Sequence, residues 1–114
     1  MAVISVSDTP EGVWGVAGWA FRQILDDVIA QYSNDERMAA EFEHAKAISG
    51  LVLYLVEPSL ANRIKSAIRN VVDGILAGTI RSGISEQPYG DTVTVAQYLD
   101  SLKQLSRILP PSDN

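Results

Sequence analysis

The chain has a single histidine, and it lies in the stretch Glu41-Phe42-Glu43-His44. On a helix, a Glu-x-x-His spacing puts a carboxylate and an imidazole on one face, which is how di-iron helical bundles hold their metal. Such a centre needs two of these motifs and two further glutamates, so one histidine is too few. On a helical wheel Glu41 and His44 also flank the apolar stripe. We therefore expect a solvated helix face that holds no metal ion and no other cofactor.

Hydrolytic and nucleotide chemistry find no better support in the sequence. The chain has no cysteine, so the common nucleophile–base pairs would all depend on His44. A Gly-x-Ser-x-Gly elbow, a dinucleotide-binding glycine pattern and a phosphate-binding loop are all missing from the sequence. An enzyme would have to be a small-ligand or metal-dependent helical protein, with Tyr89, Asp91 and His44 in a pocket closed by residues 79–93. We favour a protein that is not an enzyme.

Acidic residues are concentrated in the first half of the chain. Residues 1–57 carry nine acidic and three basic side chains, a net charge of −6. Residues 58–114 carry five acidic and six basic side chains, a net charge of +1. An acidic surface repels nucleic acids and anionic membranes and attracts basic proteins. We therefore expect a basic protein as the partner, and neither a nucleic acid nor a membrane.

The two tryptophans lie in the glycine-rich sequence GVWGVAGWA, residues 12–20. Read as the start of a helix, this sequence places Trp14 at the edge of the apolar stripe and Trp19 on the opposite side, beside glycines and charged residues. A large aromatic side chain in such surroundings is typical of an interface anchor. We expect one of four covers for it: the chain's own arm 2–7, its own loop 79–93, a second copy or a foreign partner. The candidate partner-binding residues are Trp19, Asp26, Asp35, Glu36 and Glu43.

Four segments of the chain have the apolar periodicity of amphipathic helices. They span residues 10–32, 34–56, 58–77 and 94–109. Pro10 suits the first turn of a helix, and capping boxes beginning at Ser33 and Thr94 mark the starts of the second and fourth helices. Gly78 is well placed to end the third helix.

These helices predict an all-α fold, an antiparallel four-helix bundle that forms one domain over residues 1–114. Residues 1–8 are expected to form an extended arm or a short strand, 79–93 a long loop and 110–114 a frayed tail. The run 51–56 is apolar on every side, so periodicity also allows a buried strand there.

Protein binding is the function that these features favour. No apolar run approaches the roughly 18–20 residues of a membrane span, and the N-terminus lacks the basic region of a signal peptide. We therefore expect a cytoplasmic protein, whose small size is typical of bacteria. Our hypothesis is a small acidic module, an inhibitor or immunity-type protein that neutralises a basic protein. A structural homodimer is the remaining alternative.

Overall fold

The computed structural model describes residues 1–109, which contain four α-helices and a three-stranded sheet. In chain order the elements are β1 (Ala2–Ser5), η1 (Pro10–Gly12), β2 (Val13–Val16), α1 (Gly18–Gln31), α2 (Glu36–Ile48), β3 (Gly50–Val52), η2 (Leu53–Leu55), α3 (Pro58–Ala77), η3 (Gly83–Glu86) and α4 (Thr92–Ile108), where η marks a 3-10 turn. The fold is therefore α+β, and the prediction of an all-α four-helix bundle is wrong.

The two C-terminal helices lie close to where the sequence predicts them. α3 coincides with the predicted helix 58–77, and Gly78 ends it in the left-handed conformation, with φ at 82°. α4 begins two residues before Thr94, because Asp91 is the residue that caps it. The Asp91 carboxylate accepts a hydrogen bond from the backbone N–H of Thr94 at 2.8 Å. The segment predicted as one long loop, 79–93, contains the turn η3 and the first residues of α4.

The predicted helix 10–32 is wrong in its N-terminal third. Residues Val13–Val16 form β2, which pairs antiparallel with β1 and places Trp14 opposite Ile4. Both of these side chains are buried. Valine and tryptophan favour strands, while glycines inside a helix cost roughly 0.5–1 kcal/mol each. The apolar residues here fit either period, and strand pairing with the N-terminal arm decides between them. The N-terminal arm forms β1, which confirms the prediction of a short strand within residues 1–8.

The predicted helix 34–56 is wrong in its C-terminal third. α2 ends at Ile48, and Ser49 takes a left-handed conformation with φ at 57°. The chain then turns into β3, which pairs parallel to β1. The alternative of a strand in the apolar run is therefore confirmed at its beginning, before the run continues as η2.

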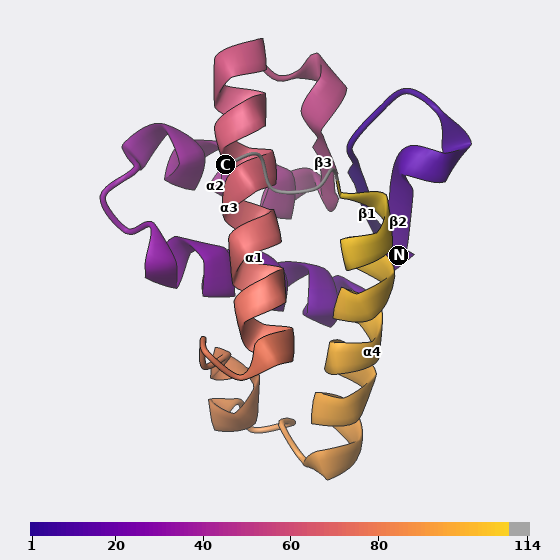
Figure 1. Cartoon of the computed structure of the whole chain (residues 1–114), viewed down its shortest axis with the longest axis vertical. Helices are drawn as coiled ribbons and strands as arrows, with labels where there is room; N and C mark the ends of the chain where they lie inside the picture. The colour runs from indigo at the N-terminus through magenta and orange to yellow at the C-terminus, as the bar shows by residue number, and fades with distance from the viewer. Residues whose placement is uncertain (110–114) are drawn as a thin grey trace.

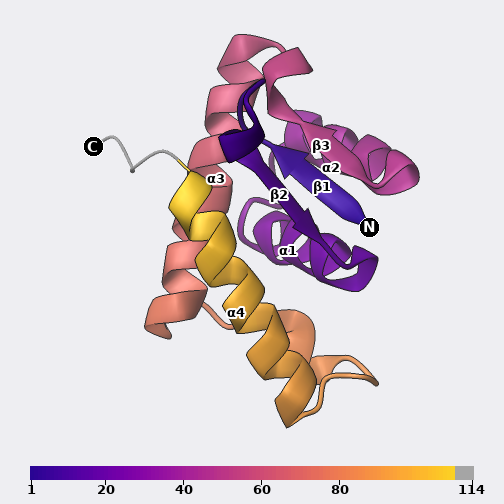
Figure 2. The ribbon, with the colours of Figure 1, turned by 90° about the vertical axis from the view of Figure 1, so that its right-hand side faces the viewer.

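The sheet has the order β2-β1-β3, and one of its faces packs on the helices. α1 lies beneath this face, α4 runs beside β2 and α2 lies beside β3 (Figures 1 and 2). α3 packs against the other three helices. In Figure 2 no helix passes over the opposite face of the sheet. The core joins both layers; its largest side chains with almost no exposure include Ile4, Phe21, Phe42, Leu51, Ile68 and Tyr98.

The sequence also predicts a frayed C-terminal tail and no membrane-spanning helix. The tail 110–114, predicted to be frayed, lies outside the described residues. Of the four described helices, none combines the length with the apolar character that crossing a bilayer requires.

Candidate functional site

The five predicted partner-binding residues occupy three separate places on the molecule. Asp26 and Glu43 meet between α1 and α2, where both bind Lys46. Asp35 and Glu36 lie together at the start of α2, in the lining of a groove. Trp19 lies apart from both pairs, against tyrosines of the segment that contains η3 and α4.

Asp26 and Glu43 come from different helices and share one cation. The Lys46 ammonium donates to both carboxylates, and its Nζ lies 3.3 Å from Glu43 Oε1. The Asp26 and Glu43 side chains are 51% and 75% exposed, whereas Lys46 is 22% exposed. Burial disfavours the charged ammonium, but the hydrogen bonds and charges of Asp26 and Glu43 outweigh it and raise the pKa of Lys46. The surface there presents two exposed carboxylates around one largely covered ammonium.

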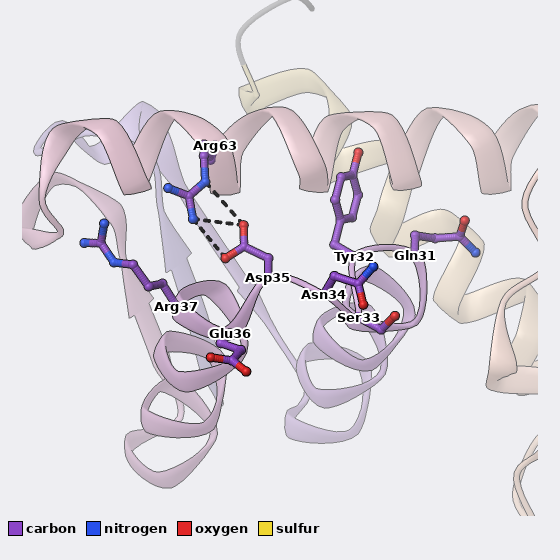
Figure 3. A pocket seen from close by; sticks show the side chains of 8 residues that line it. All are labelled: Gln31, Tyr32, Ser33, Asn34, Asp35, Glu36, Arg37 and Arg63. Carbon is purple, nitrogen blue, oxygen red and sulfur yellow. Dashed lines mark hydrogen bonds and ion pairs between the residues drawn. The ribbon is translucent and has the colours of Figure 1, made fainter.

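A groove lies between the α1–α2 turn and α3 (Figure 3). It consists of two hollows of about 600 Å³ and about 530 Å³ that share Tyr32, Asp35 and Arg63. The Asp35 carboxylate points to Arg63, whereas the Glu36 side chain points away from it. Uncharged polar side chains dominate the rest of the lining: Gln31, Ser33, Asn34, Asn62, Ser66 and Asn70. This lining offers hydrogen-bond donors and acceptors but little free charge.

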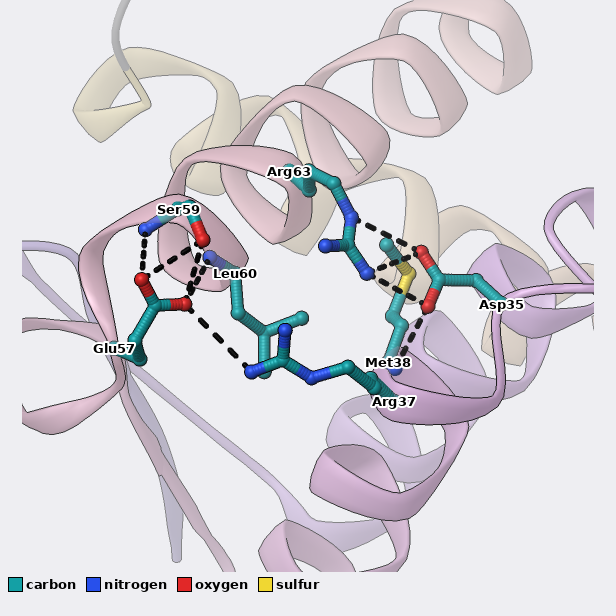
Figure 4. Close-up of polar contacts among 7 residues, drawn as sticks. All are labelled: Asp35, Arg37, Met38, Glu57, Ser59, Leu60 and Arg63. Carbon is teal, nitrogen blue, oxygen red and sulfur yellow. Dashed lines mark hydrogen bonds and ion pairs between the residues drawn. The ribbon is translucent and has the colours of Figure 1, made fainter.

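The N-terminal caps of α2 and α3 are joined by two arginines in a reciprocal arrangement (Figure 4). Asp35 caps α2, and its two carboxylate oxygens each lie 2.9 Å from Nη2 of Arg63, on α3. Glu57 caps α3, and its Oε2 lies 3.6 Å from Nη2 of Arg37, on α2. Each helix thus supplies an arginine to the capping carboxylate of the other helix.

Hydrogen bonds at the N-termini of the two helices favour the ionised form of both capping carboxylates. The hydrogen bond from the backbone N–H of Met38, followed by the one from Arg63, lowers the pKa of Asp35. The hydroxyl of Ser59, together with backbone N–H groups at the start of α3, lowers the pKa of Glu57 to about 2. Asp35 is therefore already paired with Arg63. Within residues 1–109, Glu36 is the acidic residue at this end of α2 that forms no ion pair.

The residues suggested for an enzyme are not brought together. Tyr89 packs on Trp19, Asp91 caps α4, and His44 is exposed on α2. No hydrogen bond or ion pair of residues 1–109 joins any two of the three, and nowhere in that range do three His, Asp or Glu side chains gather as metal ligands would. No known protein family, curated protein or solved structure matches this chain.

Sequence reasoning missed Asp27, the carboxylate that bonds to the largest number of other residues within residues 1–109. Its Oδ1 accepts hydrogen bonds from Gln23 Nε2 at 2.9 Å and from the backbone N–H of Gly83 at 3.0 Å. Its Oδ2 accepts from the hydroxyls of Ser82 and Tyr98, the latter at 2.7 Å. Burial and the neighbouring charge of Asp27 raise the pKa of Tyr98, so this hydroxyl stays a donor. We call these five residues the Asp27 cluster.

One feature of the sequence indicates that Asp27 needs hydrogen-bond donors, although it does not identify which residues supply them. Asp27 lies near the apolar stripe of its helix, where an ionised side chain needs partners. Apart from Gln23 on the same helix, these partners lie 55 to 71 residues further along the chain, and periodicity within one helix cannot identify them. The Asp27 cluster fixes the segment around η3 onto α1 and α4.

The segment that follows η3 also covers part of Trp19. The Trp19 ring is half-buried, 6.1 Å from the ring of Tyr89 and 6.3 Å from that of Tyr98, measured between centroids. Tyr89 belongs to the segment predicted as a loop, so the chain itself covers the tryptophan in part. Trp19 is therefore packed as part of this molecule rather than presented as a free anchor.

Proposed function

We propose that this protein is a non-enzymatic binding module for a basic protein, and that the partner contacts the outer face of α1 and α2. The observation that carries the proposal is the pair of exposed carboxylates there, Asp26 and Glu43, which share the single ammonium of Lys46. A lysine or arginine of a partner would find two carboxylates already gathered at one place. Complementary charge of this kind speeds association and selects among partners.

The exposed stripe of α2 extends this acidic face. Glu36, Ala40, Glu43 and Ala47 are all exposed and recur at intervals of three or four residues, so they share one side of the helix. The two glutamates are separated by about 10 Å at a rise of 1.5 Å per residue. The alanines between them leave room for a partner to approach the helix closely. We call this set the acidic stripe.

An inhibitor or immunity-type role suits this arrangement. Such a protein needs a rigid scaffold that presents acidic side chains at fixed positions, and it needs no catalytic group. Here two helices that pack on a common core hold the acidic stripe and Asp26 in place. Trp19 contributes less to the proposed contact than the sequence suggests, because its ring packs on Tyr98 in the interior.

A charge-reversal variant tests this proposal. The immobilised protein is exposed to an extract of the organism that encodes it, at low and at high salt, beside the variant Glu36→Lys/Glu43→Lys. We expect a basic protein that binds the wild type, is released by salt and is not retained by the variant. Asp73→Lys/Asp100→Lys is the matched control, since it changes the net charge equally at exposed positions of α3 and α4. If the control loses the partner as fully as the variant, or no basic protein is retained, the proposal is wrong.

The groove favours small-ligand binding as a second candidate function. Each hollow falls within the range of about 300–1,000 Å³ that is usual for ligand pockets, and amide and hydroxyl groups line both. A ligand bound there would raise the melting temperature of the folded chain. A thermal-shift screen of metal ions and nucleotides, repeated with Asn70→Ala, checks this candidate. A shift that Asn70→Ala does not reduce would place the ligand elsewhere.

A further inference from the structure

A row of small polar side chains runs along the exposed side of α3. Asn62, Ser66 and Asn70 follow one another at intervals of four residues, and all three are exposed. Asparagine and serine are poorer helix formers than alanine, glutamate or lysine, because their side chains compete for backbone hydrogen bonds. Positions at which a sequence departs from local preference in this way are expected at functional sites. We call these three residues the α3 row.

The α3 row lines the hollow of about 530 Å³ between α3 and the α1–α2 turn. From the turn, Tyr32 points toward α3 (Figure 3), where its hydroxyl accepts a hydrogen bond from Nδ2 of Asn70 at 3.1 Å. Arg63 makes a second link between α3 and the turn, because it binds Asp35. These two links hold the walls of the hollow in place before any ligand arrives, which lowers the entropic cost of binding.

The charged side chains that line the groove balance one another. Across its two hollows, Asp35 and Glu36 are acidic, and Arg37 and Arg63 are basic. An ionic ligand, such as a nucleotide or a metal ion, finds no surplus of opposite charge in this lining. A neutral ligand that is rich in hydrogen-bonding groups suits the groove better.

The spacing of the α3 row matches one neutral polymer, the backbone of an extended peptide. Residues four apart on a helix are separated by about 6 Å along its axis, and rows of this kind are inclined to the axis by about 26°. The distance along the row from one side chain to the next is therefore about 6.7 Å. An extended peptide presents an N–H and C=O pair on the same edge at every second residue, which is a repeat of about 6.6–6.8 Å.

The side chains of the row also have the hydrogen-bonding groups that such a backbone needs. An asparagine amide carries both a donor and an acceptor, so it can pair with the C=O and the N–H of one peptide residue. Asn70 uses one of its two N–H hydrogens on Tyr32 and keeps the other, together with its oxygen. The hydroxyl of Ser66 donates and accepts as well. From Asn62 to Asn70 the row covers about four residues of an extended chain.

We propose that this groove binds an extended segment of the basic partner through the backbone of that segment. The inference rests on the proposed function, because Glu36 belongs both to the groove lining and to the acidic stripe and so makes the two surfaces continuous. The segment lies along the α3 row, with one edge of its backbone on the three polar side chains. Its alternate side chains face Met38 and Ala67, two buried apolar residues of the lining, so small apolar side chains suit those positions.

A peptide titration of the isotope-labelled protein, followed by amide NMR spectroscopy, tests the proposal. The probe is acetyl-Thr-Ala-Thr-Ala-Thr-Ala-amide, a neutral hexapeptide, added up to about 10 mM. We expect saturable shifts of the backbone amides of residues 31–37 and 62–70, with a Kd of about 1 mM. The same hexapeptide methylated at every backbone nitrogen has lost its donors and should bind at least about tenfold more weakly.

Asn62→Ala/Asn70→Ala removes both amides of the row and replaces them with a better helix former. This variant should keep the circular dichroism spectrum of the wild type and bind the hexapeptide about tenfold more weakly. The matched control is Gln97→Ala/Gln104→Ala, which removes two exposed amides from α4, outside the groove lining. The control should bind the hexapeptide like the wild type.

Four results would overturn the proposal: no shifts of residues 62–70 up to the highest peptide concentration, equal binding of the methylated hexapeptide, an unchanged Kd of Asn62→Ala/Asn70→Ala, or a control that loses binding as fully. Maltohexaose is a neutral oligosaccharide and serves as a second probe. If it shifts these amides while the hexapeptide does not, the groove binds an oligosaccharide and the proposal is wrong.

Retention of the basic partner from the extract is measured separately from binding of the hexapeptide. If the basic partner is retained and the hexapeptide does not bind, the assignment of the groove is wrong and the proposed function stands. If the hexapeptide binds and no basic protein is retained, the groove recognises a peptide backbone and the proposed function is wrong.

Discussion

Asp27 and Asp35 each join distant parts of the chain through a carboxylate, but one does so in the interior and the other on the surface. The Asp27 side chain is buried and accepts four hydrogen bonds from α1, η3 with its preceding serine, and α4. Asp35 is partly exposed and accepts one backbone hydrogen bond and the guanidinium of Arg63. Arg63, the ion-pair partner of Asp35, is 44% exposed, so water can replace it, whereas Gln23, Ser82 and Tyr98 around Asp27 are at most 9% exposed. We therefore expect the interior contacts to decide stability and the surface contacts to adjust it.

Removing the interior carboxylate is the strongest way to test that difference. Asp27→Ala leaves two hydroxyls and an amide without their acceptor among buried side chains, together with the backbone N–H of the half-buried Gly83. We expect the free energy of unfolding to fall by about 3–5 kcal/mol, a large part of the total for a domain of this size. Urea unfolding followed by circular dichroism measures the loss.

Asp35→Ala is the matched surface variant. It removes a helix cap and an ion pair at once, yet the Arg63 guanidinium that it leaves behind is 44% exposed and open to water. The melting temperature should fall by only a few degrees. If Asp35→Ala and Asp27→Ala lower the stability equally, burial is not what separates the two sites.

The same contrast explains how far the sequence predicts this structure. The helices α3 and α4 follow from an apolar period of 3.6 and from Gly78, because all of these signals lie within one segment. The sheet does not follow, since β1, β2 and β3 are stabilised by one another across up to some fifty residues. In GVWGVAGWA the valines and Trp14 fit a helix face as well as a strand face, and only the pairing with β1 decides.

The candidate site divides along the same line. That Glu36 and Glu43 share one exposed side of a helix could be predicted, because it needs only the helical period. That Asp26 and Glu43 meet at Lys46 depends on how α1 and α2 pack, and the Asp27 cluster depends on three elements at once. The positions of the site residues relative to one another depend on contacts between helices. The sequence pattern predicts each helix separately and does not predict those contacts.

Tyr98→Phe sharpens the comparison within the interior. It removes one of the four donors to Asp27 and keeps the ring that packs on Trp19. We expect a loss of about 1–3 kcal/mol, smaller than for Asp27→Ala, because three donors still satisfy the carboxylate. Urea unfolding gives the stability, and tryptophan fluorescence of the folded state should be unchanged. A loss as large as that of Asp27→Ala would show that the tyrosine hydroxyl alone sustains the cluster.

Glu57 gives the smallest expected effect and the one that depends on pH. Its pKa is about 2 in the folded chain against an ordinary value of 4.5, so the folded state binds the proton more weakly than the unfolded state. The stability from this cap is therefore fully present above about pH 4.5 and is lost as the pH falls through about 2. Glu57→Gln lacks this contribution. The variant should melt a few degrees below the wild type at neutral pH, and the gap should close between those two values.

Melting curves of the wild type and Glu57→Gln at neutral pH and at several points down to about pH 2 measure this gap. Asp100→Asn is the control, because Asp100 is exposed on α4 and forms no ion pair or side-chain hydrogen bond within residues 1–109. Its gap to the wild type should stay near zero throughout. A Glu57→Gln gap that persists undiminished at the acidic end would mean that the amide loses packing rather than charge. The contact between Glu57 and the start of α3 would then stabilise the fold through packing, whereas Asp27 stabilises it through the hydrogen bonds that its carboxylate accepts.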